Sequence, residues 1–304
     1  MRLSLALSAM LFAVGLSAVD AVPAAAEDPP AQAAKPSQPQ RPRASDTLKP
    51  PKKHASSSPI TDRFALRVLY WPTSITTDLR LDQRNGTTGT ELSAENDLGM
   101  KDSKSEGRAE LMFRLRERNR LRVDYMKLAR TGDTVLNKTI NFGNQTFLVN
   151  DRTQTLLEWR QLTFTYSRSV FYTDRFEAGL GLGISVIEAR SRGEVTARNI
   201  REHQEAVGAF PTIALDTTWR VSKRWSLNLR GQRFNTSVNR FTGSLADYHG
   251  DVQYRWRENL ALGLGYSRMH QLVDVGRDNA QPGDLTGRFD QSIRGPELFL
   301  RASF

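Results

Sequence analysis

The segment Arg294-Gly-Pro-Glu-Leu-Phe-Leu-Arg-Ala-Ser-Phe304 alternates between apolar and other side chains with a period of two. Its apolar set is Leu298, Leu300, Ala302 and Phe304, and the other positions hold Glu297, Phe299, Arg301 and Ser303. In a β-strand, a period of two places these two sets on opposite faces. A closed barrel in lipid needs strands that are apolar outside and polar inside. The segment therefore predicts a membrane-spanning strand that ends on an aromatic residue.

The same alternation recurs upstream, so that ten segments between Phe64 and Phe304 carry it. The clearest runs from Phe176 to Val186, where large apolar residues alternate with Glu177, three glycines and Ser185. The remaining segments begin at Phe64, Ala109, Leu121, Leu162, Ile213, Trp225, Val252 and Leu260. This repetition predicts an all-β protein: a closed, antiparallel, transmembrane up-and-down β-barrel of about ten strands. Eight and twelve strands are the alternatives.

The connections between these segments alternate in length. Short polar turns are expected at 116–120, 169–175, 222–224 and 257–259, and long polar loops at 72–107, 131–154, 189–209, 235–246 and 274–294. Short turns on one side and long extracellular loops on the other are typical of bacterial outer-membrane barrels. A soluble β-sandwich or a lipocalin-like barrel is the competing interpretation. Glycines on the polar face and the terminal Phe304 favour the membrane barrel.

The N-terminal region predicts export. Arg2 precedes an apolar run from Leu3 to Val19, and Ala24-Ala25-Ala26 forms a small-residue cleavage site. These features predict a secretory signal peptide over residues 1–26. Residues 27–61 are rich in proline and basic side chains and lack a periodic apolar pattern. We expect them to form a disordered periplasmic tether, either a solvated leader or a contact to peptidoglycan, and residues 62–304 to form the barrel.

Composition narrows the function classes. The 304 residues suffice for one large domain, and 38% of them are hydrophobic, which suits a barrel with one apolar face. The absence of cysteine excludes thiol catalysis and cysteine-based metal sites. The net charge of +10 is compatible with nucleic acid, anionic lipid or lipopolysaccharide phosphate. The basic residues form no face interleaved with stacking aromatics, so nucleic acid is not expected. No motif for a cofactor or a metal was found.

The terminal strand resembles the closing strand of Gram-negative outer-membrane β-barrel proteins, whose final Phe is part of the signal that the barrel assembly machinery reads. The resemblance covers Phe64 to Phe304 and is to a class, in which the OmpA-type transmembrane domain and OmpW-like barrels are the nearest comparisons. It implies a monomer in the bacterial outer membrane, with lipid, lipopolysaccharide and the assembly machinery as partners, and Phe304 as the assembly signal. It offers no residue-level motif for an activity.

Side chains predicted to face the lumen carry charges of both signs. They are Arg67, Glu110, Arg114, Arg122, Asp124, Glu177, Asp216, Arg220, Arg230, Asp251, Arg255, Glu297 and Arg301. Opposite charges in a narrow lumen should pair, because an unpaired buried charge is costly. Salt-bridged filling is favoured over a narrow selective pore, which would need a ring of one sign. Outward aromatics near strand ends predict an interfacial girdle of Tyr70, Tyr166, Trp219, Trp225, Trp256 and Tyr266.

The function expected from these patterns is a non-enzymatic barrel, structural or narrow-channel. Two alternatives stay open. Asp247 and His249 resemble the Asp-x-His pair of omptin surface proteases, although the second acidic pair, Asp78 and Asp82, departs from that family's spacing. The other alternative is a loop-mediated adhesin or a lipopolysaccharide-binding protein. Its basic candidates are Arg190, Arg192, Arg198, Arg201 and Arg294.

Overall fold

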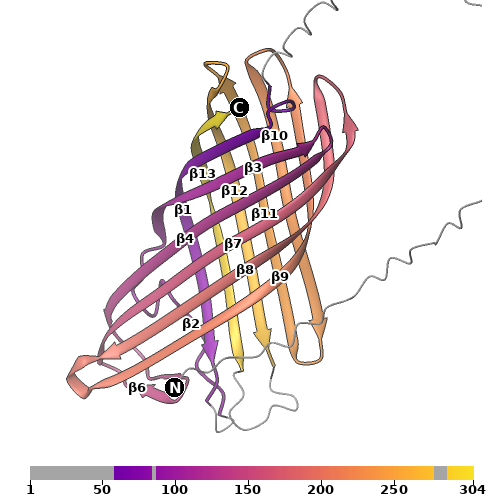
Figure 1. Ribbon diagram of the computed structural model, residues 1–304. Coiled ribbons are helices and arrows are strands. Elements are labelled where there is room, and N and C mark those ends of the chain that lie inside the picture. The colour runs from indigo at the N-terminus through magenta and orange to yellow at the C-terminus, as the bar shows by residue number, and fades with distance from the viewer. Residues whose placement is uncertain (1–57, 84–86, 277–285) are drawn as a thin grey trace, which may run out of the picture. The chain divides into compact units, whose positions relative to one another are not determined.

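A computed structural model describes residues 58–83, 87–276 and 286–304. Ten long antiparallel strands close into a barrel (Figure 1). They are β1 (Phe64–Leu81), β3 (Ser103–Arg116), β4 (Asn119–Val135), β7 (Arg152–Tyr172), β8 (Phe176–Val195), β9 (Ile200–Arg220), β10 (Trp225–Val238), β11 (Phe241–Arg255), β12 (Leu260–Val275) and β13 (Gly287–Ser303). The predicted fold class and strand number are confirmed. Among the described residues, no helix is long and apolar enough to cross a membrane.

The barrel closes where the last strand pairs with the first. The ladder between β1 and β13 runs from Ala65–Ser303 to Leu81–Gly287 and skips the stretch around Pro72, which has no N–H to donate. Gly295 fits against this stretch, since a Cβ there would lie 2.1 Å from the Pro72 carbonyl oxygen. The Trp71 indole donates to the Gly295 carbonyl at 3.2 Å. The seam therefore stays closed at its proline.

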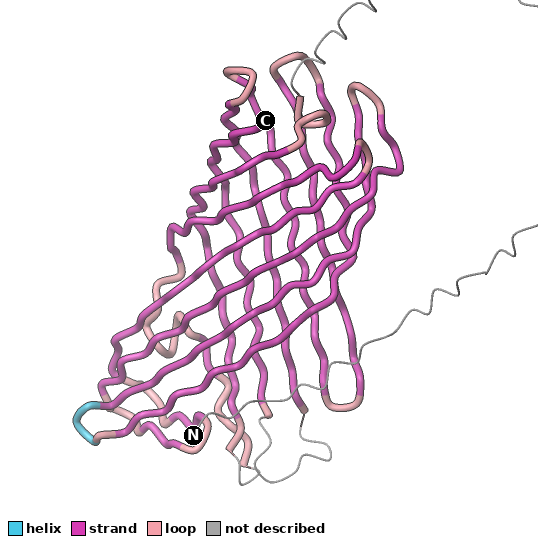
Figure 2. The backbone as a smooth tube through the Cα atoms, viewed as in Figure 1, coloured by secondary structure: helices cyan, strands magenta, loops and turns pink. Residues whose placement is uncertain are grey.

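The two ends of the barrel differ, as predicted. At the short-turn end, which includes the C-terminus, tight turns join β3 to β4, β7 to β8, β9 to β10 and β11 to β12 (Figure 2). The opposite end, called the loop end below, holds short turns from β8 to β9 and from β10 to β11 and the long connections from β1 to β3, β4 to β7 and β12 to β13. These include β2 (Leu92–Ser93) and a small hairpin of β5 (Ile140–Phe142) and β6 (Gln145–Phe147). An apolar cluster around Leu92, Leu136 and Phe147 packs them together.

The alternation of apolar and polar side chains reverses its sign partway along the strands. On β4, Leu121, Val123 and Tyr125 occupy outward positions and Arg122 and Asp124 are buried inside; farther on, Lys127 is exposed and Leu128 is buried. On β8, Leu182 is 70% exposed, whereas Ile187 is 4% exposed. The outer surface is thus apolar next to the short turns and polar toward the loop end. The lumen shows the opposite order.

This reversal corrects the predicted loop lengths. Long loops were expected at 189–209 and 235–246, but β8 ends at Val195 and β9 begins at Ile200, while β10 ends at Val238 and β11 begins at Phe241. The period of two continues through both regions with polar residues outward. The predicted strands therefore ended too early, because their ends were placed where outward apolar residues stop.

The predicted signal peptide and most of the predicted tether lie outside the described residues. Residues 58–61, assigned from the sequence to the end of the tether, form a turn in which Ser58 and Ile60 are each 1% exposed. Asp62, which follows, is buried as well. This turn packs against the barrel at its short-turn end.

We expect Leu182→Arg to lower the free energy of unfolding in lipid bilayers by about 2–4 kcal/mol, because the side chain lies midway along the outward apolar positions of β8. Thr76→Arg is the matched control, since Thr76 is exposed on β1 beyond the apolar surface. Denaturant titration of both variants in vesicles checks this. Equal costs for the two changes would show that the apolar surface does not contact lipid.

Candidate functional site: a charged lumen closed by an apolar cluster

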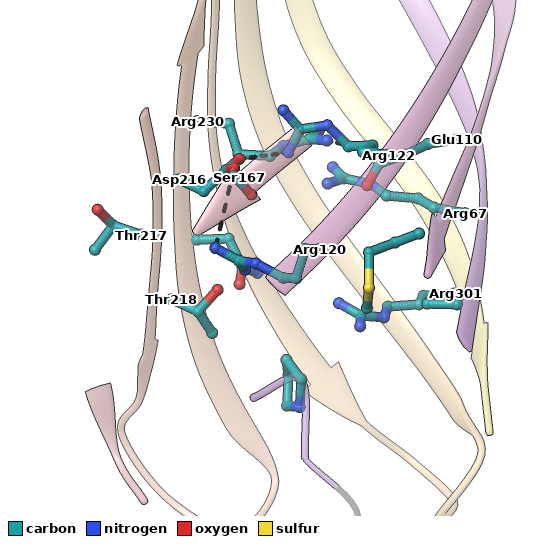
Figure 3. Close-up of a pocket in the computed structure, with 14 residues that line it drawn as sticks. Arg67, Glu110, Arg120, Arg122, Ser167, Asp216, Thr217, Thr218, Arg230 and Arg301 are labelled. Carbon is teal, nitrogen blue, oxygen red and sulfur yellow. Dashed lines mark hydrogen bonds and ion pairs between the residues drawn. The ribbon is translucent and has the colours of Figure 1, made fainter. Parts of the chain in front are cut away.

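The half of the lumen next to the short turns is filled with ion pairs (Figure 3). Eight arginines take part: Arg67, Arg108, Arg114, Arg120, Arg122, Arg230, Arg255 and Arg301. Eight carboxylates face them: Asp62, Glu110, Asp124, Glu177, Asp216, Asp247, Asp251 and Glu297. Every strand that carries one of these groups places it at an inward position. The lumen is therefore filled by paired charges.

Arg67 links three strands across the closing seam. Its guanidinium lies 2.8 Å from Asp251 on β11 and 3.2 Å from Glu297 on β13. The same group stacks over the Phe299 ring, 3.6 Å from the ring centroid. The first strand is thus connected to its neighbour β13 and to β11 by one side chain.

On the other side of the lumen, Arg114 of β3 and Glu177 of β8 form a two-bond pair, at 2.8 and 2.9 Å. Ser169 donates a further hydrogen bond to Glu177, and Arg114 also reaches the Asp62 carbonyl at 3.3 Å. Glu177 is 0% exposed. Removing one member of such a buried pair leaves an uncompensated charge, at a cost of about 3–5 kcal/mol.

A third group of ion pairs joins β4 to β9 and β3 to β10. Arg122 of β4 donates to Asp216 of β9 and lies 3.2 Å from Asp124. Arg230 of β10 donates to Glu110 of β3 across the lumen. These contacts span the interior, so they hold opposite walls of the barrel together.

All the charged residues predicted for the lumen occupy inward positions. Arg220, the last residue of β9, is only half-buried, at the short-turn end. Arg108, Arg120 and Asp62 belong to the same network but were not predicted. Arg108 precedes the apolar segment that marked its strand, Arg120 was assigned to a turn, and Asp62 precedes the first strand.

The six aromatic residues predicted for the girdle all point outward, with exposures between 46% and 61%. Trp219, Trp225 and Trp256 lie at strand ends next to the short turns. Tyr70 and Tyr266 lie at the other limit of the apolar surface, where Tyr125 and Tyr248 are also exposed. These last two were not among the predicted girdle residues.

On the loop-end side of the ion pairs, an apolar cluster fills the lumen. Its buried members come from eight strands: Trp71, Ile75, Met126, Leu128, Trp159, Ile187, Phe210, Leu245, Met269 and Ile293. Phe234 of β10 packs against them. Side chains contributed from almost the whole circumference meet in one cluster, which occupies the lumen at this level.

The Asp247–His249 pair lies on the short-turn side of this cluster and is part of the charged network. His249 Nδ1 is 2.8 Å from Glu297 and its Nε2 is 2.9 Å from Asp247, which also accepts a hydrogen bond from Arg108 at 2.8 Å. Asp247 is 4% exposed and His249 is 6% exposed. At the loop end, Asp78 occupies an outward position and Asp82 is buried against the Gly89 amide, so the two aspartates do not form a pair with the dyad.

The basic residues proposed for lipopolysaccharide are in part paired with acids. Arg190 lies 2.5 Å from Glu188, and Arg201 lies 2.9 Å from Glu194. Arg198 pairs with Asp151. Arg192 and Arg294 are exposed, and no ion pair joins them to another described residue. No group of side chains suited to hold a metal ion occurs among the described residues.

Comparisons with known proteins bear on the fold. No family model and no curated protein matches this sequence. The structure of the outer membrane protease OmpT from Escherichia coli aligns with 79% of this chain and 96% of its own, at 9% identity and a TM-score of 0.51. The Pseudomonas putida toluene transporter TodX (82% and 93% covered, 8% identity, TM-score 0.31) and the Yersinia pestis attachment invasion locus protein Ail (77% and 98% covered, 6% identity, TM-score 0.33) also match. The chain has the fold of outer-membrane β-barrels.

We expect Glu177→Gln to lower the free energy of unfolding by about 3–5 kcal/mol, because it leaves Arg114 buried without its counter-charge. Glu117→Gln, in the exposed turn between β3 and β4, is the matched control and should change stability by less than about 0.5 kcal/mol. Denaturant unfolding in detergent measures both. A Glu177→Gln protein as stable as the control would contradict the role given to this pair.

Proposed function

We propose that this protein is a non-enzymatic barrel of the bacterial outer membrane, sealed to solutes, whose strands extend beyond the membrane at the loop end. The observation that supports it best is the apolar cluster closing the lumen above a charge-paired interior. A narrow-channel function would need a continuous polar path, which this cluster interrupts. The barrel then serves as a rigid support for the surface that it displays.

The membrane location is supported by the exposed apolar surface. Leu182, Ile213 and Leu264 are 70%, 67% and 66% exposed, which would be costly in water for so many large side chains on one continuous surface. Lipid contacts them in our proposal. Arg268 and Arg294 lie directly opposite each other on β12 and β13, just beyond this surface. This pair of exposed cations suits lipopolysaccharide phosphates.

The omptin-like protease stays a prediction without support from the geometry. Its candidate dyad is buried beneath the apolar cluster, where a peptide has no access. Both dyad members already engage other groups of the ion-pair network. The likeness to OmpT concerns the fold alone.

A second candidate function, binding of an extended peptide, is favoured by the place where β3 and β4 part. Their ladder ends at the pair Arg108–Met126. Beyond it, β3 continues along β1 as far as Ser103, and β4 continues along β7 as far as Val135. Each of these extensions pairs on one side only. Two strand edges without a ladder partner therefore face each other at the loop end, and the β4 edge is partly contacted by Leu98 and Lys104.

A groove of about 860 Å³ lies at these edges, lined by residues 99–104 together with parts of β4, β7 and β8. The Lys104 ammonium donates to the Ala129 carbonyl, so the backbone groups of β4 on this edge point into the groove. Free strand edges of this kind accept an added strand from a partner.

The charged side chains that line the groove indicate which kind of partner it would bind. Asp133 and Glu194 in the lining are paired with Arg152 and Arg201. Hydrogen bonds from Arg152 hold the pKa of Asp133 below its usual value, so Asp133 is an anion that already has its counter-ion. Lys101 and Arg192 contribute positive charge without such a partner among the described residues. An acidic, extended segment of a partner protein is the occupant that we propose, which makes this surface an adhesin-like one.

We expect the purified protein to produce no conductance steps in planar bilayers, because the apolar cluster blocks the lumen. Insertion of the same protein preparation is verified by protease protection in lipid vesicles. Reproducible steps from inserted protein would contradict the sealed barrel and support the narrow channel.

A fluorescent peptide of alternating glutamate and valine should bind the detergent-solubilised protein, measured by fluorescence anisotropy. N-methylation of alternate amides in the same peptide should weaken binding about tenfold or more, since it removes donors worth about 1 kcal/mol each. Arg192→Ala should also weaken binding, while Arg233→Ala, exposed on β10 away from the groove, should not. Equal affinity for the methylated peptide would rule out strand addition.

A further inference from the structure

The ion-pair network as a whole is balanced, with eight arginines and eight carboxylates. Its charges are nevertheless unevenly placed around one cavity, which arginines line more than carboxylates do.

This cavity, of about 50 Å³, lies within the ion-pair network. Its charged lining is Arg67, Arg120, Arg122, Arg230 and Arg301, against only Glu110 and Asp216. In Figure 3 the guanidinium groups of Arg120 and Arg122 are both directed toward Asp216, and Arg301 lies on the opposite side of the cavity. Pro59, from the turn before β1, lines the cavity as well.

Arg120 is the group in this cavity that lacks a hydrogen bond. Its side chain is 10% exposed, and the nearest carboxylate oxygens, of Glu177 and Asp216, lie 3.6 and 3.9 Å away. Its Nε and Nη2 are buried without a hydrogen-bond partner in the described structure. Nε and Nη2 of Arg230 and Nε of Arg301 are in the same state. Leaving the donors of a buried charged group unpaired is costly.

We propose that this cavity binds a small inorganic anion, of chloride to phosphate size, held chiefly by Arg120. Such an ion accepts hydrogen bonds from the unpaired guanidinium nitrogens and offsets the local positive charge. Water satisfies the donors but leaves that charge in place. The arginine lining excludes cations. This anion site shares no residue with the groove at the loop end or with the apolar cluster in the lumen.

The test uses the folded barrel in detergent at constant ionic strength, with chloride or inorganic phosphate replacing the bulky anion gluconate. Stability is followed by denaturant unfolding. For the wild type, each tenfold increase of the bound anion above its Kd should add about 1.4 kcal/mol. The anion that stabilises, chloride or phosphate, identifies the occupant. Unchanged stability in both salts would mean a water-filled cavity and would overturn the proposal.

Arg120→Gln should abolish this dependence, whereas Arg118→Gln, the same change at an exposed turn position, should retain it. A dependence that survives in Arg120→Gln would reflect a general salt effect and would also overturn the proposal. If Arg120→Gln does not fold, crystals of the wild type in bromide decide the question. An anomalous peak in bromide, or phosphate density in crystals soaked with inorganic phosphate, within hydrogen-bonding distance of Arg120 supports the site, and the absence of both refutes it.

Discussion

The structure depends on the ladder that joins β13 to β1. In a hydrocarbon surrounding, each unpaired backbone group costs several kcal/mol, so a sheet can exist there only if it has no free edge. The pairs from Ala65–Ser303 to Leu81–Gly287 remove that edge, and Gly295 allows the two strands to approach at Pro72. Arg67 adds a connection through Asp251 and Glu297 on the lumen side of the seam.

Closure creates an interior that the side chains must fill, and the chain fills it in two layers. Paired charges occupy the part surrounded by the exposed apolar surface, and an apolar cluster occupies the part surrounded by polar residues. The apolar cluster is accompanied by buried polar side chains such as Gln161, Gln271 and Gln291. In the function that we propose, the exchange of polarity both suits the outer surface to lipid and then to water and seals the lumen.

Much of this fold could be predicted from the sequence, because outward apolar residues at a period of two identify each strand by itself. The strand extensions could not, since Trp159 and Ile187 lie inward where Arg160 and Glu188 lie outward, and this reversed pattern resembles a polar loop. Inward charges were predictable in position, but their partners were not. Arg114 and Glu177 are 63 residues apart and meet only because of the stagger of the strands. The arginine cavity and the groove between β3 and β4 depend on register in the same way.

The central claim is that the outward side chains near the short turns contact lipid and that the exchange of polarity places the rest of the barrel in water. Because the chain has no cysteine, nitroxide labels can be scanned along β8 in vesicles at single introduced cysteines. Collisions with oxygen should peak at every second position from Ala178 to Val186, and collisions with a water-soluble nickel reagent should replace them from Glu188 to Glu194. Access of the nickel reagent to the outward positions between Ala178 and Val186 would contradict the account.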